Sequence, residues 1–406
     1  MNNAQNSSLK RVFASRAFLS VWMTGLCAGV MRWLEILAVG VYTLEATGSA
    51  LAVALMYFAR TVPTLVLGPV AGVLAERISR NSLYIGALLV MFTVSSVLSV
   101  LAASQLLELW HVALGAVLSG SVWSFEHTVR RTIARDVVPP DTIGNAISLD
   151  TGSQNATRMM GPLVGGVIMT VVGLTGAFVI GAVLYALALF LMLGVPQVAQ
   201  QPASAAPSFW DGIVDGLRYV RERPALAGVL VVTIVLNLFG FPYVSMVPVI
   251  GRDEIGLEPD AIGLMAAAEG LGAVLGAMVL AVTVESRHYR RLFTGGASLF
   301  MVMMIVFAHA GTMMMGAASL LLAGIGLGLF AAMQSTILLT GAEAHMRSRV
   351  MGMLVVTIGA GPFGVLMLGT LAEYVGASNG LLMTASTGSV LLLLAVVRWP
   401  VLMSGD

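Results

Sequence analysis

The chain has few charged residues for its length. Lys, Arg, Asp and Glu make up 10% of its 406 residues, whereas hydrophobic side chains make up 58%. Soluble domains carry about 25% charged residues, so this chain has too few to cover a core with a polar surface. Its mean hydropathy of +0.93 agrees with that conclusion. The composition therefore predicts an integral membrane protein.

Cysteine and histidine are also scarce, and neither charge sign is in large excess. Cys27 is the only cysteine and can form no internal disulfide, and the five histidines are scattered. The sequence contains no phosphate-binding glycine loop and no paired cysteine motif, so we expect no metal site, no cofactor and no ATP-driven step. A formal net charge of +1 gives no electrostatic support to nucleic-acid binding.

Long apolar runs of helix-spanning length, without the alternation of strands, fill most of the chain. Twelve such runs are predicted to be transmembrane helices, at 17–43, 49–71, 82–104, 108–130, 142–171, 175–195, 224–250, 261–284, 293–311, 313–341, 349–373 and 379–400. Forty-five glycines suit close helix packing, because lipid offers no hydrophobic drive for helix association.

The basic residues predict an orientation. Of the 21 Lys and Arg, 17 lie in the N-terminal tail or in alternate connections, and only Arg252 lies in the opposite set of connections. Cytoplasmic loops carry such an excess of basic residues. Both termini are therefore predicted to be cytoplasmic.

The longest connection predicts how the chain divides. Residues 196–223 begin as a Pro, Ala, Ser and Gln linker and end in a stretch whose apolar residues recur at helical spacing. We expect an amphipathic helix on the inner membrane surface there. The chain is then an N-terminal six-helix bundle (1–195), this cytoplasmic linker (196–223) and a C-terminal six-helix bundle (224–406).

A short charged turn separates the second and third runs. It contains Gly72, Glu76, Arg77 and Arg80, and the acid and arginines can form charge-assisted hydrogen bonds that break and re-form as two halves move. The turn resembles the loop between helices two and three of the major facilitator superfamily. It departs from that pattern in three places, with Glu76 for Asp, Ser79 for Gly and Asn81 for a basic residue. An alternative is a loop that only sets orientation.

A second motif lies in the fifth run. Gly161, Pro162, Gly165 and Gly166 match the fixed residues of the Gly-Pro-x-x-Gly-Gly signature that antiporters of the superfamily carry in helix five. Proline removes a backbone hydrogen bond and the glycines admit a neighbouring helix. The resemblance implies export rather than uptake; the alternative is a kink without directional meaning.

Several further segments are similar to the branch of the superfamily that contains enterobactin exporters and macrolide efflux proteins. They are Thr47–Ala52, Pro63–Arg80, Arg131–Pro139, Gly216–Pro224 and Arg349–Gly352. The resemblance implies two pseudo-symmetric six-helix bundles in a bacterial inner membrane, working as a functional monomer by alternating access. It further implies a small-molecule substrate, no enzymatic activity, and a proton gradient as the driving force.

Charged and amide residues within the predicted spans are candidates for substrate binding or proton coupling, because each is costly in hydrocarbon. They are Arg32, Glu35, Arg60, Asp150, Gln154, Arg158 and Glu269. Arg32 and Glu35 are three residues apart, so they could neutralise each other or face a substrate. A network among these residues could bind an anionic or catecholate substrate or lock the N-terminal half. Glu126, beside Arg130 and Arg131, is expected in a charge cluster at the cytoplasmic interface.

Glu269 lies in an apolar part of the eighth run. Such a setting disfavours a charged carboxyl, which would let this group load and release a proton. The alternative is a solvated carboxylate in an outer vestibule.

The sequence thus predicts proton-coupled export of a siderophore or a hydrophobic, drug-like molecule. The alternatives are import of a small metabolite, lysolipid flipping by the same fold, or a membrane sensor that transports nothing.

Overall fold

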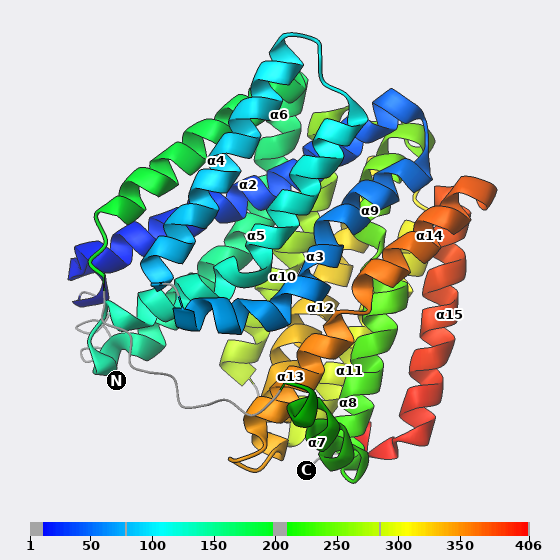
Figure 1. The fold of residues 1–406 in the computed structure, drawn as a ribbon. Coiled ribbons are helices and arrows are strands. Elements are labelled where there is room, and N and C mark those ends of the chain that lie inside the picture. The colour runs from blue at the N-terminus through cyan, green and yellow to red at the C-terminus, as the bar shows by residue number, and fades with distance from the viewer. Residues whose placement is uncertain (1–10, 78, 198–208, 284–285, 405–406) are drawn as a thin grey trace. The chain divides into compact units, whose positions relative to one another are not determined.

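The structure is a computed structural model that describes residues 11–77, 79–197, 209–283 and 286–404, with backbone only at 66, 68–77, 209–213, 281–283 and 286. The described residues are almost entirely helical (Figure 1). They group into two compact units: unit 1 is Met1–Val39 with Ala59–Ser204, and unit 2 is Gly40–Phe58 with Ala205–Asp406.

Unit 1 is built from long helices of the N-terminal half. They are α2 (Arg16–Thr47), α3 (Ala50–Arg77), α4 (Arg80–Ala103), α5 (Leu109–Asp136) and α6 (Ile143–Leu193), with the C-terminal end of α2 and the N-terminal part of α3 belonging to unit 2. The 3-10 turn η1 (Pro140–Thr142) leads into α6.

Helix α6 is too long to be a single membrane span. Its 51 residues would extend about 76 Å at 1.5 Å per residue, whereas the hydrocarbon core is about 30 Å thick. Gly173 interrupts it with φ +64° and ψ −168°, a conformation that glycine adopts without steric cost. The break lies between the predicted runs 142–171 and 175–195.

Glycine brings helices of unit 1 into backbone contact. A Cβ on Gly120 of α5 would overlap the carbonyl oxygen of Arg60 on α3, and one on Gly161 of α6 would overlap Trp33 on α2. Gly165 lies one turn further along α6, and a Cβ added to it would lie 3.1 Å from the Cα of Leu34. Small residues permit such approach where lipid gives no hydrophobic drive.

Unit 2 contains the remaining helices. They are α7 (Phe209–Arg221), α8 (Pro224–Val235), η2 (Leu236–Gly240), α9 (Tyr243–Val249), η3 (Ile250–Glu254), α10 (Pro259–Thr283), η4 (Ser286–His288), α11 (Tyr289–Phe307), α12 (Met313–Gly341), α13 (Arg347–Ile358), α14 (Gly361–Val375), α15 (Ala377–Arg398) and η5 (Pro400–Leu402). The π-helix η2 interrupts the predicted run 224–250, the π-helix η3 begins at the last residue of that run, and a break at Gly359 divides the run 349–373.

Helix α7 occupies the second part of the predicted linker. Its Gly216 packs against the backbone of Arg349 on α13, and the Arg349 guanidinium lies 3.2 Å from the Asp215 carboxylate. Val214 and Leu217 are 56% and 55% exposed. The helix is therefore held by one face and presents apolar side chains on the other.

Two carboxylates cap helix starts in unit 2. Glu373 of α14 accepts hydrogen bonds from the Ser49 hydroxyl at 2.8 Å and the Leu51 amide at 3.1 Å, at the start of α3. Glu254 of η3 caps α15 in the same manner, accepting from the Ser378 amide at 2.8 Å and from its hydroxyl. Both satisfy amides that a helix start leaves without intrahelical partners.

Nine helical segments of the described chain are long and apolar enough to cross a membrane. Their bounds are Arg16–Thr47, Arg80–Ala103, Pro140–Leu193, Pro224–Glu254, Pro259–Leu280, Tyr289–Phe307, Met313–Gly341, Arg347–Val375 and Ala377–Arg398. The predictions of an all-helical chain and of several apolar spans are confirmed.

Candidate functional site

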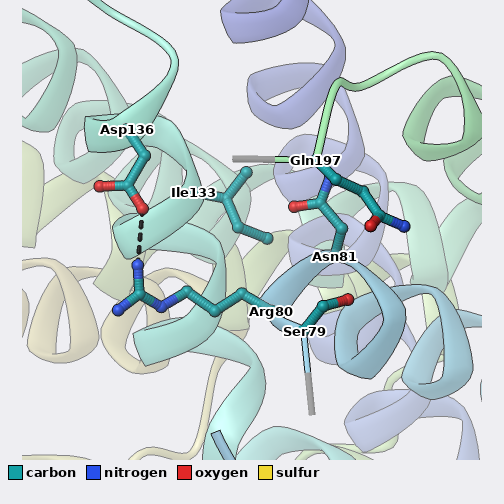
Figure 2. Close-up of a pocket in the computed structure, with 6 residues that line it drawn as sticks. All are labelled: Ser79, Arg80, Asn81, Ile133, Asp136 and Gln197. Atoms are coloured by element: carbon teal, nitrogen blue, oxygen red, sulfur yellow. Dashed lines mark hydrogen bonds and ion pairs between the residues drawn. The ribbon is translucent and has the colours of Figure 1, made fainter. Parts of the chain in front are cut away.

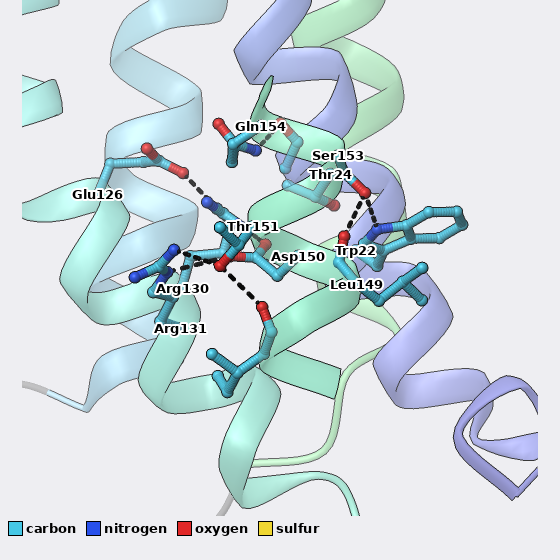
Figure 3. A network of polar contacts seen from close by, with 12 residues as sticks. Trp22, Thr24, Glu126, Arg130, Arg131, Leu149, Asp150, Thr151, Ser153 and Gln154 are labelled. Carbon is cyan, nitrogen blue, oxygen red and sulfur yellow. Dashed lines mark hydrogen bonds and ion pairs between the residues drawn. The ribbon is translucent and has the colours of Figure 1, made fainter. Parts of the chain in front are cut away.

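A chain of buried arginines and carboxylates runs through unit 1. We call its members the arginine–carboxylate network: Arg32, Glu35, Arg60, Glu126, Arg130, Arg131 and Asp150. They come from α2, α3, α5 and α6. Figure 3 shows the part that surrounds Arg130 and Asp150. Charges in such surroundings are costly unless they are paired and hydrogen-bonded.

One end of the network is centred on Glu35 of α2, whose residue is 5% exposed. Its carboxylate accepts from the Arg60 guanidinium at 3.1 Å and from the Ser119 hydroxyl at 3.3 Å, and the Tyr185 hydroxyl lies at 3.5 Å. Arg60 also donates to the backbone carbonyl of Arg32 at 3.5 Å. These contacts hold the Arg60 side chain of α3 against α2.

The centre of the network is Glu126 of α5. One carboxylate oxygen accepts from Arg32 at 3.0 Å, while the other accepts from the Arg130 Nε at 2.8 Å and the Tyr84 hydroxyl at 3.1 Å. Glu126 is 4% exposed. Glu126 thus lies in a charge cluster with Arg130, as expected, and the cluster also includes Arg32, because α5 turns the carboxylate towards α2 and α4.

The other end of the network is Asp150 of α6. Its carboxylate accepts from Arg130 through one oxygen and from the Arg131 Nε at 3.1 Å through the other. Asp150 and Arg130 are 2% and 1% exposed, whereas the Arg131 side chain is 33% exposed. The network thus begins in a buried position and reaches the protein surface at Arg131.

The pairing differs from the one considered from the sequence. Arg32 and Glu35 lie three residues apart on α2, yet Arg32 binds Glu126 and Glu35 binds Arg60. The physical reason is that cross-helix pairing neutralises four charges, whereas an Arg32–Glu35 pair would leave Arg60 and part of the Glu126 site uncompensated.

A small cavity opens beside this network. Its lining includes Arg32, Arg60, Tyr84, Trp123, Glu126 and Tyr185, and its volume is about 30 Å³. That volume holds one or two water molecules. The Arg32 guanidinium lies 5.0 Å from the centre of the Trp123 ring, and Trp123 itself is 37% exposed. The cavity therefore combines a cation, an aromatic face and hydroxyl groups.

The remaining intramembrane candidates lie apart from this cavity. Gln154 donates to the carbonyl of Gly25 at 3.2 Å, and the Arg158 guanidinium lies 4.9 Å from the centre of the Trp33 ring. Glu269, on α10 of unit 2, is 4% exposed. The fifth-helix motif lies in α6, where Pro162 and Gly166 are buried.

The predicted cytoplasmic gate is described only in part. Only the backbone is described at Gly72, Glu76 and Arg77, so the predicted contacts of Glu76 and Arg77 lie outside the described part of the chain. Arg80 is described and donates to the Asp136 carboxylate at 2.7 Å. Figure 2 shows this pair beside Asn81, whose amide donates to the carbonyls of Val195 and Pro196 at 3.1 and 3.0 Å.

Sequence reasoning did not select Glu126, Arg130, Tyr84, Ser119 or Tyr185 as site residues. A signal was available for two of them, because Glu126 and Arg130 are four residues apart and so share one face of α5. The hydroxyl residues gave no comparable signal. Their roles depend on how α4, α5 and α6 are rotated, which the sequence pattern does not specify.

Comparisons with known proteins give the chain its relatives. A family model described as transmembrane secretion effector matches residues 8–403. Multidrug efflux pump Tap of Mycolicibacterium fortuitum is 27% identical over 375 residues, which is 88% of this chain and 90% of that protein. Macrolide efflux protein A of Streptococcus pyogenes is 22% identical over 288 residues, 70% of each chain. The Staphylococcus aureus (strain NCTC 8325 / PS 47) staphyloferrin A transporter is 22% identical, covering 61% of this chain and 63% of its own.

Solved structures share the fold. The nucleoside transporter NupG matches with a TM-score of 0.73 and 12% identity over 94% of this chain and 98% of that one. A bacterial homologue of the human lysosomal transporter Spinster, inward-facing and unoccupied, matches with a TM-score of 0.69 and 14% identity over 95% and 97%. Identities this low support the fold alone.

Proposed function

Because the chain belongs to the transmembrane secretion effector family of the major facilitator superfamily, we propose that it exports a small molecule in exchange for protons. The substrate class is a siderophore or a hydrophobic, drug-like compound. The observation that carries this proposal is the arginine–carboxylate network, because charges buried in a membrane domain are characteristic of substrate and ion pathways. The efflux and siderophore-transport names of the relatives support the direction and the substrate class.

The proposed architecture has twelve membrane spans. Nine helical segments of the described chain have the length and composition of spans. Dividing α6 at Gly173 adds one, and α3 and α5 add two more. Helix α5 is less apolar because it carries buried charges such as Glu126 and Arg130, which the network compensates. The twelve would form two six-helix bundles, within 1–195 and 224–406, joined by 196–223.

In the proposed topology both termini are cytoplasmic and the membrane is the bacterial inner membrane. The excess of basic residues in alternate connections supports this orientation. Helix α7 would lie on the inner membrane surface, with the exposed Val214 and Leu217 towards lipid. One copy of the chain is proposed to be the functional unit.

Proton coupling is assigned to buried carboxyls. Glu35 and Asp150 lie within the network, and Glu269 lies buried on α10. Transport would be driven by the proton gradient through these groups, without a cofactor. Gln154 and Arg158 on α6 would add hydrogen-bonding capacity and positive charge near α2, where their contacts place them.

Alternating access requires a gate at the cytoplasmic end. We assign it to the turn that contains Gly72, Glu76, Arg77 and Arg80, together with Asp136, which binds Arg80. Such charge-assisted bonds can open and close with modest cost when they are near water. The Gly161–Gly166 motif would let α2 and α6 stay in contact during the movement.

A whole-cell efflux experiment tests the proposal. Cells that express the chain should accumulate less erythromycin, ethidium or citrate-based siderophore than cells that express an Arg60→Gln variant. A protonophore should abolish the difference, because it removes the gradient. Equal accumulation of every compound in both strains would contradict export, and greater accumulation with the wild-type chain would indicate an importer.

A further inference from the structure

The two arginines that line the cavity are held very differently. Arg60 binds the Glu35 carboxylate and the Arg32 carbonyl, and its own backbone is pressed against Gly120. Arg32 forms an ion pair with Glu126, and its guanidinium lies over the Trp123 ring. A guanidinium has five N–H donors, so Arg32 retains donor capacity on the side of the cavity. Arg32 is thus the cation that can exchange partners.

Glu126 can release Arg32 without becoming an isolated charge. It would still accept from the Arg130 guanidinium at 2.8 Å and the Tyr84 hydroxyl at 3.1 Å. Arg130 in turn remains bound to Asp150. Breaking a buried pair is expensive when one partner is left uncompensated, and these contacts remove that expense on the Glu126 side. Arg32 would be left as an unpaired buried charge, and that cost disappears if another anion replaces Glu126 as its partner.

The charge of the network favours such an anion. Its seven members are four arginines and three carboxylates, which leaves one formal positive charge when all are ionised. The members that line the cavity, Arg32, Arg60 and Glu126, carry the same excess. One further anion beside Arg32 would bring the network to neutrality, whereas a cation would raise the excess.

We propose that this cavity binds an anionic group of the transported molecule through Arg32. When the cavity is empty, the Glu126 carboxylate pairs with Arg32 instead. This inference rests on the proposed transport function and specifies its substrate class. The carboxylate or catecholate binds the Arg32 guanidinium, while an attached aromatic or apolar part lies against Trp123. A volume of about 30 Å³ suits the anionic group alone, so the body of the molecule extends past the exposed edge of Trp123.

The argument separates the possible substrates. A molecule whose only charge is positive meets two arginines in the cavity, and the one carboxylate there, Glu126, is already paired with Arg32 and Arg130. A polycarboxylate or catecholate satisfies Arg32 and leaves Glu126 with Arg130. The cavity therefore favours a siderophore-like anion over a cationic drug.

Binding to the purified full chain in lipid nanodiscs tests the proposal. The probes are carboxyfluorescein, which is an aromatic anion, and ethidium, which is an aromatic cation; fluorescence anisotropy gives each Kd. Wild type should bind carboxyfluorescein more tightly. Arg32→Gln should weaken that binding roughly 10- to 100-fold, the loss expected for a charge-assisted hydrogen bond. Arg32→Lys should restore part of it, and Arg11→Gln, at an exposed ion pair, should leave it unchanged.

Glu126→Gln gives a result that general damage to the fold cannot produce. Removing the internal competitor for Arg32 should tighten carboxyfluorescein binding, while Arg130 keeps Asp150. Equal affinity for both probes, or weaker anion binding in Glu126→Gln together with unchanged binding in Arg32→Gln, would overturn the proposal. This experiment measures binding, whereas the efflux experiment measures transport, so the two proposals can fail separately. Normal anion selectivity without efflux refutes the transport function alone. Efflux of ethidium with no anion binding refutes the anionic site alone.

Discussion

The Arg60–Glu35 pair allows the energetics of the network to be predicted with some precision. The two side chains are 9% and 7% exposed and their charged atoms lie 3.1 Å apart. Arg60→Met would leave the Glu35 carboxylate buried with only Ser119 and Tyr185 as hydrogen-bond donors. Removing one partner of a buried ion pair costs about 3–5 kcal/mol. We expect a loss of this size in the free energy of unfolding.

The double variant Arg60→Met with Glu35→Leu separates charge from packing. It removes both charges, so it should be destabilised less than either single variant, in line with buried pairs that apolar residues can replace. The exposed pair of Arg11 and Asp141 is a matched comparison, because its atoms lie closer, at 2.6 Å, but its side chains are 54% and 56% exposed. Its loss should cost at most about 1 kcal/mol.

Equilibrium unfolding in mixed micelles, with an increasing mole fraction of denaturing detergent, measures all four variants. The reasoning fails if Arg60→Met costs less than the Arg11→Gln comparison. It also fails if the costs of the two single variants simply add in the double variant, since that would mean the charges do not interact.

Three further predictions concern packing, a helix cap and proton coupling. Gly120→Val should prevent recovery of folded monomer in size-exclusion chromatography, because its side chain meets the Arg60 carbonyl, while Gly86→Ala, in open space, should not. Glu373→Ala should raise the rate of amide hydrogen exchange in the first turn of α3 about fivefold, the effect of losing roughly 1 kcal/mol of capping. The control Glu254→Ala should raise the rate only at the start of α15. An unchanged exchange rate in α3 of Glu373→Ala would rule out the cap. Glu269→Gln should abolish substrate-driven pH change in vesicles while leaving binding intact, and an unaltered proton flux would remove this residue from the coupling groups.

Much of the fold follows from the sequence, because a membrane imposes a minimum length on apolar runs. The predicted gap at 172–174 contains Gly173, where α6 breaks. The linker helix of 209–221 was expected because its apolar residues recur at helical spacing. An interruption inside a run, such as η2, gave no signal, because its residues Leu236–Gly240 are mostly apolar, like those of the neighbouring helices.

The site was less predictable than the fold, for a physical reason. The costly residues Arg32, Glu35, Arg60 and Asp150 could be selected from their position within apolar runs. Their partners could not, because helices that are apolar on every side do not reveal which face meets which neighbour. Glu126 is the example: its position near basic residues suggested an interface, and only the rotation of α5 shows that it faces Arg32.

Reconstituted transport tests the central claim most directly. The purified chain in proteoliposomes, with a pH gradient imposed across the membrane, should move carboxyfluorescein against its concentration gradient while protons move the opposite way. A protonophore should stop both fluxes. Probe movement that ignores the pH gradient, or proton and probe fluxes in the same direction, would contradict proton-driven export.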